Sequence, residues 1–316
     1  MSPAPGSGRA VAIAFADRLA ERVAARESQL IVGVDPDPAA LWPAAVRSAD
    51  PGGAAAERAA AAVTAHCRAL LDAAAPACVG AKLQLACFER LGPPGWRALF
   101  DVAAHARQLG LLVIADGKRG DIDVSARAYG QALFGGLETP FGALGGLGAD
   151  LATVNPLLGR DALAPLLAAA RAANAGLLVL VRTSNPGAVD VEDVALADGG
   201  TVADRLARFV DELGRDGAGA SGLSDVGAVV GATAPGHLAR LRELMPRAVF
   251  LLPGIGAQGG RVEELGPAFA PGPAGGLVSA SRSIAAAHVE RGGDPADAAR
   301  VEAERLRAAA WALVAG

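Results

Sequence analysis

The sequence predicts an α/β fold, a single (β/α)8 TIM barrel with an extra N-terminal helix and loop insertions. Three observations predict it: short apolar runs alternate with Ala-rich helical stretches, eight such runs can be counted, and 316 residues suit one barrel of about 250 residues plus insertions. We therefore expect a flexible N-terminus over residues 1–8 and one barrel domain over residues 9–316.

The eight apolar runs are the expected strands. Each is followed closely by Gly, Pro, Asn or Asp, which are residues typical of turns. In chain order the runs are Leu30–Asp35, Ala77–Leu83, Leu111–Asp116, Asp150–Asn155, Gly176–Arg182, Gly227–Gly231, Ala248–Pro253 and Gly275–Ala280. Eight strands that alternate with helices close naturally into a barrel.

The stretches between the strands have helical patterns of barrel length. The expected helices are Ala54–Ala75, Trp96–Leu109, Asp161–Asn174, Val202–Gly214, Pro235–Met245 and Pro295–Val314, with Val11–Ala25 as the extra helix in front. An open doubly wound sheet is the structural alternative. No G-x-G-x-x-G follows the first strand, where a dinucleotide site in such a sheet would need it.

Four segments have the composition of insertions. They are Gly135–Gly148, Asp190–Gly200, Gly214–Gly222 and Gly266–Gly276, and most are expected to be solvated loops. The stretch Asn185–Gly200 follows the carboxyl end of a strand, where barrels build their active sites, and is therefore a candidate lid.

Composition excludes several classes of function. The 29 basic and 33 acidic residues give a net charge of −4 without a basic cluster, which argues against nucleic acid as a partner. No apolar run approaches the roughly 20 residues that span a bilayer, and Met1–Gly8 lacks the layout of a signal peptide. We therefore expect no membrane partner and a cytoplasmic location.

Cysteine and histidine spacing predicts neither a disulfide framework nor a metal site. No C-x-x-C occurs, and no pair of histidines has i, i+4 spacing. Buried reduced thiols are expected at Cys67, Cys78 and Cys87. Core or surface positions outside any metal site are expected for His66, His105, His237 and His288.

Only two of the 29 basic residues are lysines, Lys82 and Lys118. Their retention among arginines indicates positions that require a compact ammonium able to exchange its proton. Chance retention is the alternative for either lysine taken alone. The neighbours of Lys118 weigh against chance.

Asp116, Lys118 and Asp121 lie just beyond the third expected strand, in the segment 113–122. Catalytic groups of barrels sit at the carboxyl ends of strands. The i, i+2 spacing places Asp116 and Lys118 on one face if the strand continues, so the three charges would alternate minus, plus, minus. The alternative is a solvated turn, but surface ion pairs stabilise little and would not require Lys in place of Arg at position 118.

The segment Asp116-Gly-Lys118-Arg-Gly-Asp121-Ile resembles the D-x-K-x-x-D signature of orotidine 5'-phosphate decarboxylases. Related sugar-phosphate decarboxylases and synthases share the signature on the same fold. Further segments resemble the family in the same order along the chain. Asp35 stands where the family has a ribose-binding aspartate. Lys82 stands where the decarboxylase has a lysine that contacts Asp116 and the ribose, and where the metal-dependent relatives have a glutamate ligand.

The remaining matching segments imply the other substrate contacts. Arg182-Thr-Ser-Asn-Pro-Gly187 resembles the longer bacterial (type 2) form of the enzyme, and Ser184 falls where the family contacts the pyrimidine amide. Two Gly-rich or Arg-bearing segments after strands seven and eight resemble the family's phosphate grip. Their candidate residues are Pro253, Gln258, Gly259, Ser281 and Arg282.

The resemblance implies conversion of orotidine 5'-phosphate to uridine 5'-phosphate without a metal or any other cofactor. The C6 carbanion left after loss of carbon dioxide would be stabilised and protonated by Lys118, which Asp116 orients. Asp121, and Ser125 where the family usually has Thr, would reach the neighbouring subunit's site, which implies a homodimer. Asn155 stands at the end of the fourth strand, where it could line the site, but a loop asparagine with its hydrogen bonds made locally explains the residue equally well, and we assign it no role.

Two other functions remain as alternatives. One is a metal-dependent sugar-phosphate decarboxylase or synthase of the same barrel group, against which Lys82 argues. The other is a non-catalytic barrel that binds a phosphorylated ligand. Such a binder gains nothing from two carboxylates crowded around one lysine.

Overall fold

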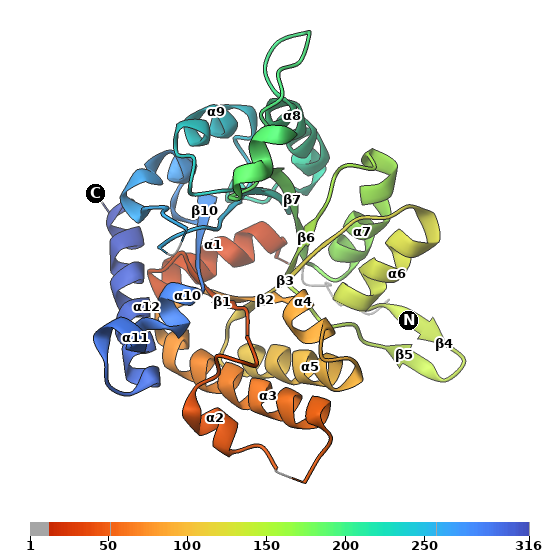
Figure 1. Ribbon diagram of the computed structural model, residues 1–316. Coiled ribbons are helices and arrows are strands. Elements are labelled where there is room, and N and C mark those ends of the chain that lie inside the picture. The colour runs from red at the N-terminus through yellow and green to blue at the C-terminus, as the bar shows by residue number, and fades with distance from the viewer. Residues whose placement is uncertain (1–12, 51, 257, 316) are drawn as a thin grey trace, which may run out of the picture.

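Eight parallel strands close into a barrel in the computed structural model, which describes residues 13–50, 52–256 and 258–315 (Figure 1). The strands follow one another around the barrel in chain order, and the last pairs with the first. They are β1 (Leu30–Val34), β2 (Gly80–Gln84), β3 (Leu112–Arg119), β6 (Leu151–Val154), β7 (Gly176–Arg182), β8 (Val226–Val230), β9 (Phe250–Leu252) and β10 (Gly276–Ala280). The predicted barrel is confirmed, and each expected strand overlaps an observed one.

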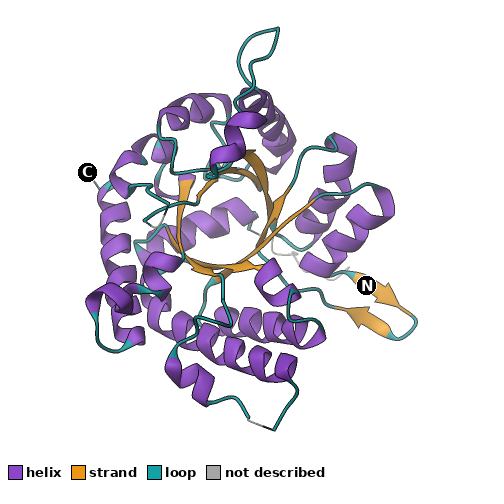
Figure 2. Cartoon of the chain, viewed as in Figure 1, coloured by secondary structure: helices purple, strands orange, loops and turns teal. Residues whose placement is uncertain are grey.

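Helices surround the barrel on its outside, as Figure 2 shows. The longer ones are α3 (Ala55–Ala74), α5 (Pro93–Gln108), α6 (Asp123–Phe134), α7 (Arg160–Ala172), α8 (Val202–Gly214), α9 (Gly236–Leu244) and α12 (Pro295–Ala312). Four short ones are α2 (Pro43–Arg47), α4 (Leu85–Glu89), α10 (Arg282–Ala285) and α11 (Ala287–Arg291). Their apolar faces and the outer faces of the strands form the larger of two core clusters.

The second core cluster fills the amino end of the barrel. The helix α1 (Phe15–Arg26) lies across this end and packs Phe15, Leu19 and Val23 against inward-facing residues such as Ile31 and Leu112 (Figure 1). Arginines of α1 donate to backbone carbonyls just before the strands, as Arg26 does to Cys78 at 2.6 Å. The amino end is therefore closed, and the carboxyl end is left for a site.

The predicted N-terminal features lie partly outside the described residues. The expected flexible segment 1–8 lies entirely outside them, and the expected helix Val11–Ala25 is seen from Phe15 onward as α1. None of the described helices is long and apolar enough to cross a membrane. The cytoplasmic location stays a prediction.

Three expectations need correction. The segment Gly135–Gly148, one of four expected insertions of which most were expected to be solvated loops, contains the antiparallel hairpin β4 (Leu137–Thr139) and β5 (Gly142–Leu144), which projects from the barrel (Figure 1). The helix α6 is absent from the expected helices, and it contains Gly130. A Cβ at Gly130 would lie 2.8 Å from the Ala169 Cβ, so the glycine allows α6 to approach α7 closely. Cys87 is half-buried, whereas Cys67 and Cys78 are buried as expected, and all three are free thiols.

Candidate active site

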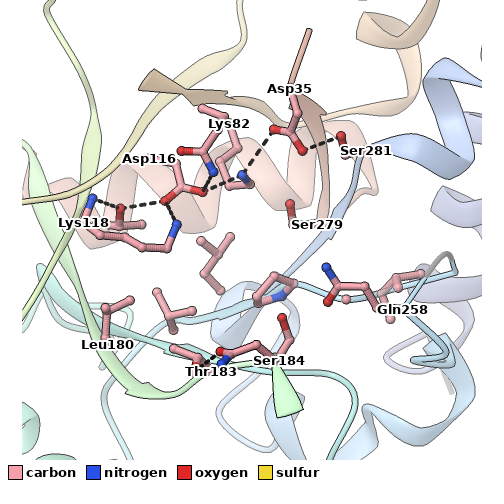
Figure 3. A pocket seen from close by; sticks show the side chains of 18 of the residues that line it. Asp35, Lys82, Asp116, Lys118, Leu180, Thr183, Ser184, Gln258, Ser279 and Ser281 are labelled. Carbon is pink, nitrogen blue, oxygen red and sulfur yellow. Dashed lines mark hydrogen bonds and ion pairs between the residues drawn. The ribbon is translucent and has the colours of Figure 1, made fainter. Parts of the chain in front are cut away.

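A cavity of about 460 Å³ opens at the carboxyl ends of the strands. Every strand of the barrel contributes to its wall, either from its last residues or from the loop that follows (Figure 3). The polar side chains that line it are Asp35, Lys82, Gln84, Asp116, Lys118, Thr153, Thr183, Ser184, Asn185, Glu192, Gln258, Ser279, Ser281 and Arg282. This is the end of the barrel at which the sequence placed the candidate residues.

The buried carboxylate of Asp116 is the centre of the polar network. Its Oδ2 accepts from the Lys82 Nζ at 2.6 Å and the Gln84 Nε2 at 3.3 Å. Its Oδ1 accepts from the Lys118 Nζ at 2.7 Å and the Thr153 hydroxyl at 2.8 Å (Figure 3). Four donors therefore fix one carboxylate, and two of them are cations.

The pKa values follow from these contacts. Burial by itself would raise the pKa of Asp116, but the charges and hydrogen bonds of Lys82 and Lys118 outweigh it and hold that pKa at about 2. Burial would likewise lower the pKa of Lys82, but Asp116 and Asp35 raise it above its ordinary value. Asp116 and Lys82 are therefore both charged near neutral pH.

Asp35 extends the cluster towards β10. The Lys82 Nζ lies 3.7 Å from the Asp35 Oδ1, and the Ser281 hydroxyl donates to the Asp35 Oδ2 at 2.7 Å. Charges therefore alternate along Asp35, Lys82, Asp116 and Lys118 across the carboxyl ends of β1, β2 and β3 (Figure 3). The sequence predicted that the charges of Asp116, Lys118 and Asp121 alternate. Within this chain the alternating charges are those of Lys118, Asp116, Lys82 and Asp35, and Asp121 is not among them.

An irregularity of β3 brings Asp116 and Lys118 together. Ala115 pairs with Ala152 and Arg119 pairs with Val154 in the ladder with β6, with a register shift between these two pairs. Lys118 has a φ of 47°, in the left-handed region that side chains rarely adopt. The two residues thus meet through a bulge, and not through the regular strand that their i, i+2 spacing indicated.

The opposite wall of the cavity carries Ser184, expected to bind the pyrimidine, and Gln258, expected to bind the phosphate, whereas Ser281 lies beside Asp35. Ser184 follows β7, Gln258 lies in the loop after β9, and their side chains are on the same side of the cavity (Figure 3). A Cβ at Gly254, whose φ is 104°, would lie 3.1 Å from the Gln258 Oε1 and 3.3 Å from the Ser184 Cβ. Gly254 therefore permits the close approach of these two side chains.

The candidate lid is fixed to the end of β7. The Arg182 guanidinium makes two hydrogen bonds with the Asp193 carboxylate, at 2.8 and 3.0 Å. Glu192 accepts from the backbone N–H and the hydroxyl of Thr183, at 2.8 and 3.0 Å. These contacts tie the far side of the segment Asn185–Gly200 to the rim, and Glu192 itself lines the cavity.

The structure brings together most of the expected site residues. Those that line the cavity are Asp35, Lys82, Asp116, Lys118, Ser184, Pro253, Gln258, Ser281 and Arg282. Asp121, Ser125 and Gly259 do not line it. Asn155 caps the turn that follows β6, because its Oδ1 accepts from the Leu157 N–H at 3.0 Å. No described group of three or more His, Cys, Asp or Glu residues is arranged to hold a metal ion.

Sequence reasoning missed several lining residues. Gln84 and Thr153 both contact Asp116, and Thr183 and Glu192 connect the rim to the candidate lid. A signal was present for Thr153, which is the one hydroxyl within the apolar run of its strand. An apolar patch inside the barrel, formed by Leu180, Val229 and Leu251, completes the wall.

Comparison with known proteins adds an independent finding. The sequence model of the "Orotidine 5'-phosphate decarboxylase / HUMPS family" matches residues 28–300. The orotidine 5'-phosphate decarboxylase of Deinococcus radiodurans is 41% identical over 270 residues, which are 85% of this chain and 88% of that protein. The enzyme of the same name from Rhodopirellula baltica is 44% identical over 232 residues, 72% of this chain and 74% of its own.

Solved structures agree with the observed architecture. The OMP decarboxylase of Leishmania donovani superposes with a TM-score of 0.69 at 30% identity, over 94% of this chain and 99% of that chain. A crystal structure of a protein from Streptomyces avermitilis superposes with a TM-score of 0.76 at 31% identity, over 99% of this chain and 100% of that chain.

Proposed function

Because this chain belongs to the orotidine 5'-phosphate decarboxylase / HUMPS family, we propose that it converts orotidine 5'-phosphate to uridine 5'-phosphate, the last step of de novo UMP synthesis. The observation that carries the proposal is the buried Asp116 carboxylate held between Lys82 and Lys118. The resemblance noted above implies a lysine at position 82 in the decarboxylase and a glutamate ligand there in the metal-dependent relatives. The type 2 motif around Ser184 supports the longer bacterial subfamily.

We further propose that the reaction uses no metal or other cofactor. The bond from C6 to the carboxylate breaks, carbon dioxide leaves, and the electron pair stays on C6. The fixed ammonium groups stabilise this charge because they are oriented before the substrate arrives. Lys118 then transfers a proton from its Nζ to C6 and regains one from water. Asp116 holds the Lys118 Nζ at 2.7 Å and thereby orients it.

The remaining candidate residues would bind the nucleotide. Asp35 and Lys82 lie on the wall proposed for the ribose, and Ser184 lies on the wall proposed for the pyrimidine amide. Pro253, Gln258, Gly259, Ser281 and Arg282 are proposed to hold the phosphate, with Arg282 as the charged partner. Energy from phosphate binding can then favour closure of the Asn185–Gly200 segment over the site.

We propose that the working form is a homodimer in which Asp121 and Ser125 serve the neighbouring site. Neither residue lines the cavity of its own chain. Ile122 and Val124, next to them in the chain, are exposed, and so are Leu157 and Leu158 in the loop after the neighbouring strand β6. Exposed large apolar side chains after these two strands fit a surface that another subunit covers.

One assay tests the proposed activity. Purified protein is treated exhaustively with a chelator, and the loss of orotidylate absorbance is followed without added metal. We expect full turnover, because no step of the proposed mechanism uses a metal. The Lys118→Ala variant serves as the inactive control. Turnover that disappears with the chelator and returns with magnesium would instead favour a metal-dependent relative, and no turnover under either condition would exclude the proposed activity.

A further inference from the structure

One side chain of β6 fills the irregular ladder beside the Asp116–Lys118 pair. Between the pair Ala115–Ala152 and the pair Arg119–Val154, β3 has three residues, Asp116, Gly117 and Lys118, whereas β6 has only Thr153. A regular parallel ladder would pair these residues one to one through backbone groups. The bulge therefore leaves backbone groups of β3 that need another partner.

The Thr153 hydroxyl supplies that partner. Its oxygen accepts from the Lys118 N–H at 3.0 Å, and its proton is donated to the Asp116 Oδ1 at 2.8 Å. An N–H can only donate and an ionised carboxylate can only accept, so the group between them must do both. A hydroxyl does so in one atom. Thr153 is 1% exposed, so its hydroxyl has almost no contact with solvent that could compete for either bond.

The two bonds act on the proposed acid and on its partner. The N–H that Thr153 holds belongs to Lys118, whose left-handed backbone is unfavourable for a residue with a Cβ. The carboxylate oxygen that Thr153 contacts is the same Oδ1 that accepts from the Lys118 Nζ. Thr153 therefore fixes Lys118 at both ends, at its backbone directly and at its ammonium through Asp116.

We propose that Thr153 is a positioning residue for proton transfer by Lys118. The inference rests on the proposed function and adds to it a residue that holds the geometry of the reacting lysine without itself reacting. It binds neither the pyrimidine nor the phosphate in this proposal. Its loss is therefore expected to slow the chemical step and to leave nucleotide affinity nearly unchanged.

The test compares two substitutions at position 153 with one elsewhere. Thr153→Val keeps the shape and removes the hydroxyl, and we expect kcat to fall about 10- to 100-fold, as the loss of a hydrogen bond to a charged group implies. Thr153→Ser keeps the hydroxyl and is expected to stay within about threefold of wild type. The affinity for UMP, measured by calorimetry, is expected to stay within about threefold in both variants. Thr64→Val is the matched control, because it removes a hydroxyl that bonds a helix carbonyl far from the site.

A second measurement tests the proton transfer separately from decarboxylation. Exchange of the C6 hydrogen of UMP with deuterium from water needs proton transfer but no decarboxylation, and it is expected to fall in Thr153→Val in parallel with kcat. If Thr153→Val does not fold, Thr153→Ala carries the same expectation.

The outcomes separate the two proposals. Wild-type protein that does not decarboxylate orotidylate overturns the proposed function. Active wild-type protein with an equally active Thr153→Val variant overturns the role of Thr153 alone. An equal loss in Thr153→Ser and Thr153→Val, or a loss of UMP affinity as large as the loss of kcat, shows a merely structural role and overturns the inference as well.

Discussion

At the scale of single residues, Lys118 is the group on which the proposed chemistry depends. Replacing it with Arg keeps the charge beside Asp116, but a guanidinium does not release its proton at working pH. We expect Lys118→Arg to lower kcat by at least about a thousandfold while the affinity for UMP changes by less than about tenfold. Steady-state kinetics and calorimetry on the same preparation measure the two quantities.

The exposed Arg160 offers a control for this prediction. Arg160→Lys makes the reverse exchange at an ion pair with Glu212 outside the cavity, and we expect it to leave kcat unchanged. Appreciable turnover by Lys118→Arg would refute proton donation by Lys118. Collapse of UMP affinity together with kcat would show that Lys118 is mainly a binding residue.

The same scale shows which site residues a sequence can reveal. Asp35, Lys82, Asp116 and Lys118 could be predicted because each stands at the end of an apolar run, and strand ends face a barrel's site. The contacts of Gln84 and Thr153 with Asp116 could not be predicted, because they depend on the register between strands. Gln84 pairs with Asp116 in the regular ladder of β2 and β3. A bulge shifts the register between β3 and β6 that brings Thr153 to Asp116, and no local pattern in either strand indicates it.

At the scale of elements, Trp42 links the start of α2 to α3 and α10. Its indole N–H donates to the Ala285 carbonyl at 2.9 Å, and its backbone N–H donates to the His66 Nδ1 at 3.2 Å. His66 is buried, and its ring contacts the indole edge to face. Trp42 thus connects α10, the helix that carries Arg282, to the neutral ring of His66 in α3.

This support predicts a pH dependence of stability. Burial, together with the neighbouring His288, lowers the pKa of His66 to about 4. The folded state therefore favours the neutral ring, so its stabilising contribution is complete above the unfolded pKa of about 6.5 and is lost as the pH falls towards about 4. The loss is on the order of 3 kcal/mol of unfolding free energy.

Urea unfolding at pH 7 and at pH 4.5 measures this effect. His66→Asn keeps an acceptor for the Trp42 N–H but does not titrate, so its stability is expected to fall less between the two pH values than that of wild type. His237→Asn, in the partly exposed first turn of α9, is the control and is expected to follow the wild-type curve within about 0.5 kcal/mol. Equal losses in wild type and His66→Asn would show that another group causes the acid sensitivity.

Elements were easiest to predict where a periodic apolar pattern continues without interruption. The strand Gly176–Arg182 and the helix Val202–Gly214 have the bounds expected from sequence. The helix α6, which was not among the expected helices, contains Gly130; a glycine is unfavourable in a helix considered alone, and the approach of Ala169 explains it. Where local helix propensity is weak, as in α6, tertiary contacts therefore determine which secondary structure forms.

At the scale of the whole molecule, the proposed homodimer predicts complementation between inactive variants. Lys118→Ala and Asp121→Ala are each expected to be nearly inactive. After subunit exchange, one site of every mixed dimer carries both substitutions, while the other combines an intact Lys118 with an intact Asp121. Half of the dimers are mixed, so activity is expected to recover to about a quarter of wild type.

Native mass spectrometry confirms in the same samples that subunits have exchanged. Lys118→Ala mixed with Lys118→Arg is the control, because no mixed site of that pair contains an intact lysine. If exchange is complete and the Lys118→Ala and Asp121→Ala mixture regains nothing, Asp121 serves its own chain or no site at all. The shared site would then be refuted.

The scarcity of lysine also makes the protein unusually simple for amine chemistry. The chain has two lysines, and their side chains differ sharply in accessibility, at 8% for Lys82 and 44% for Lys118. An acylating reagent therefore meets a single accessible ε-amine, and that amine lies inside the cavity. The number of ε-acyl groups incorporated per chain counts the open sites in a preparation, and protection by a bound nucleotide counts the occupied ones.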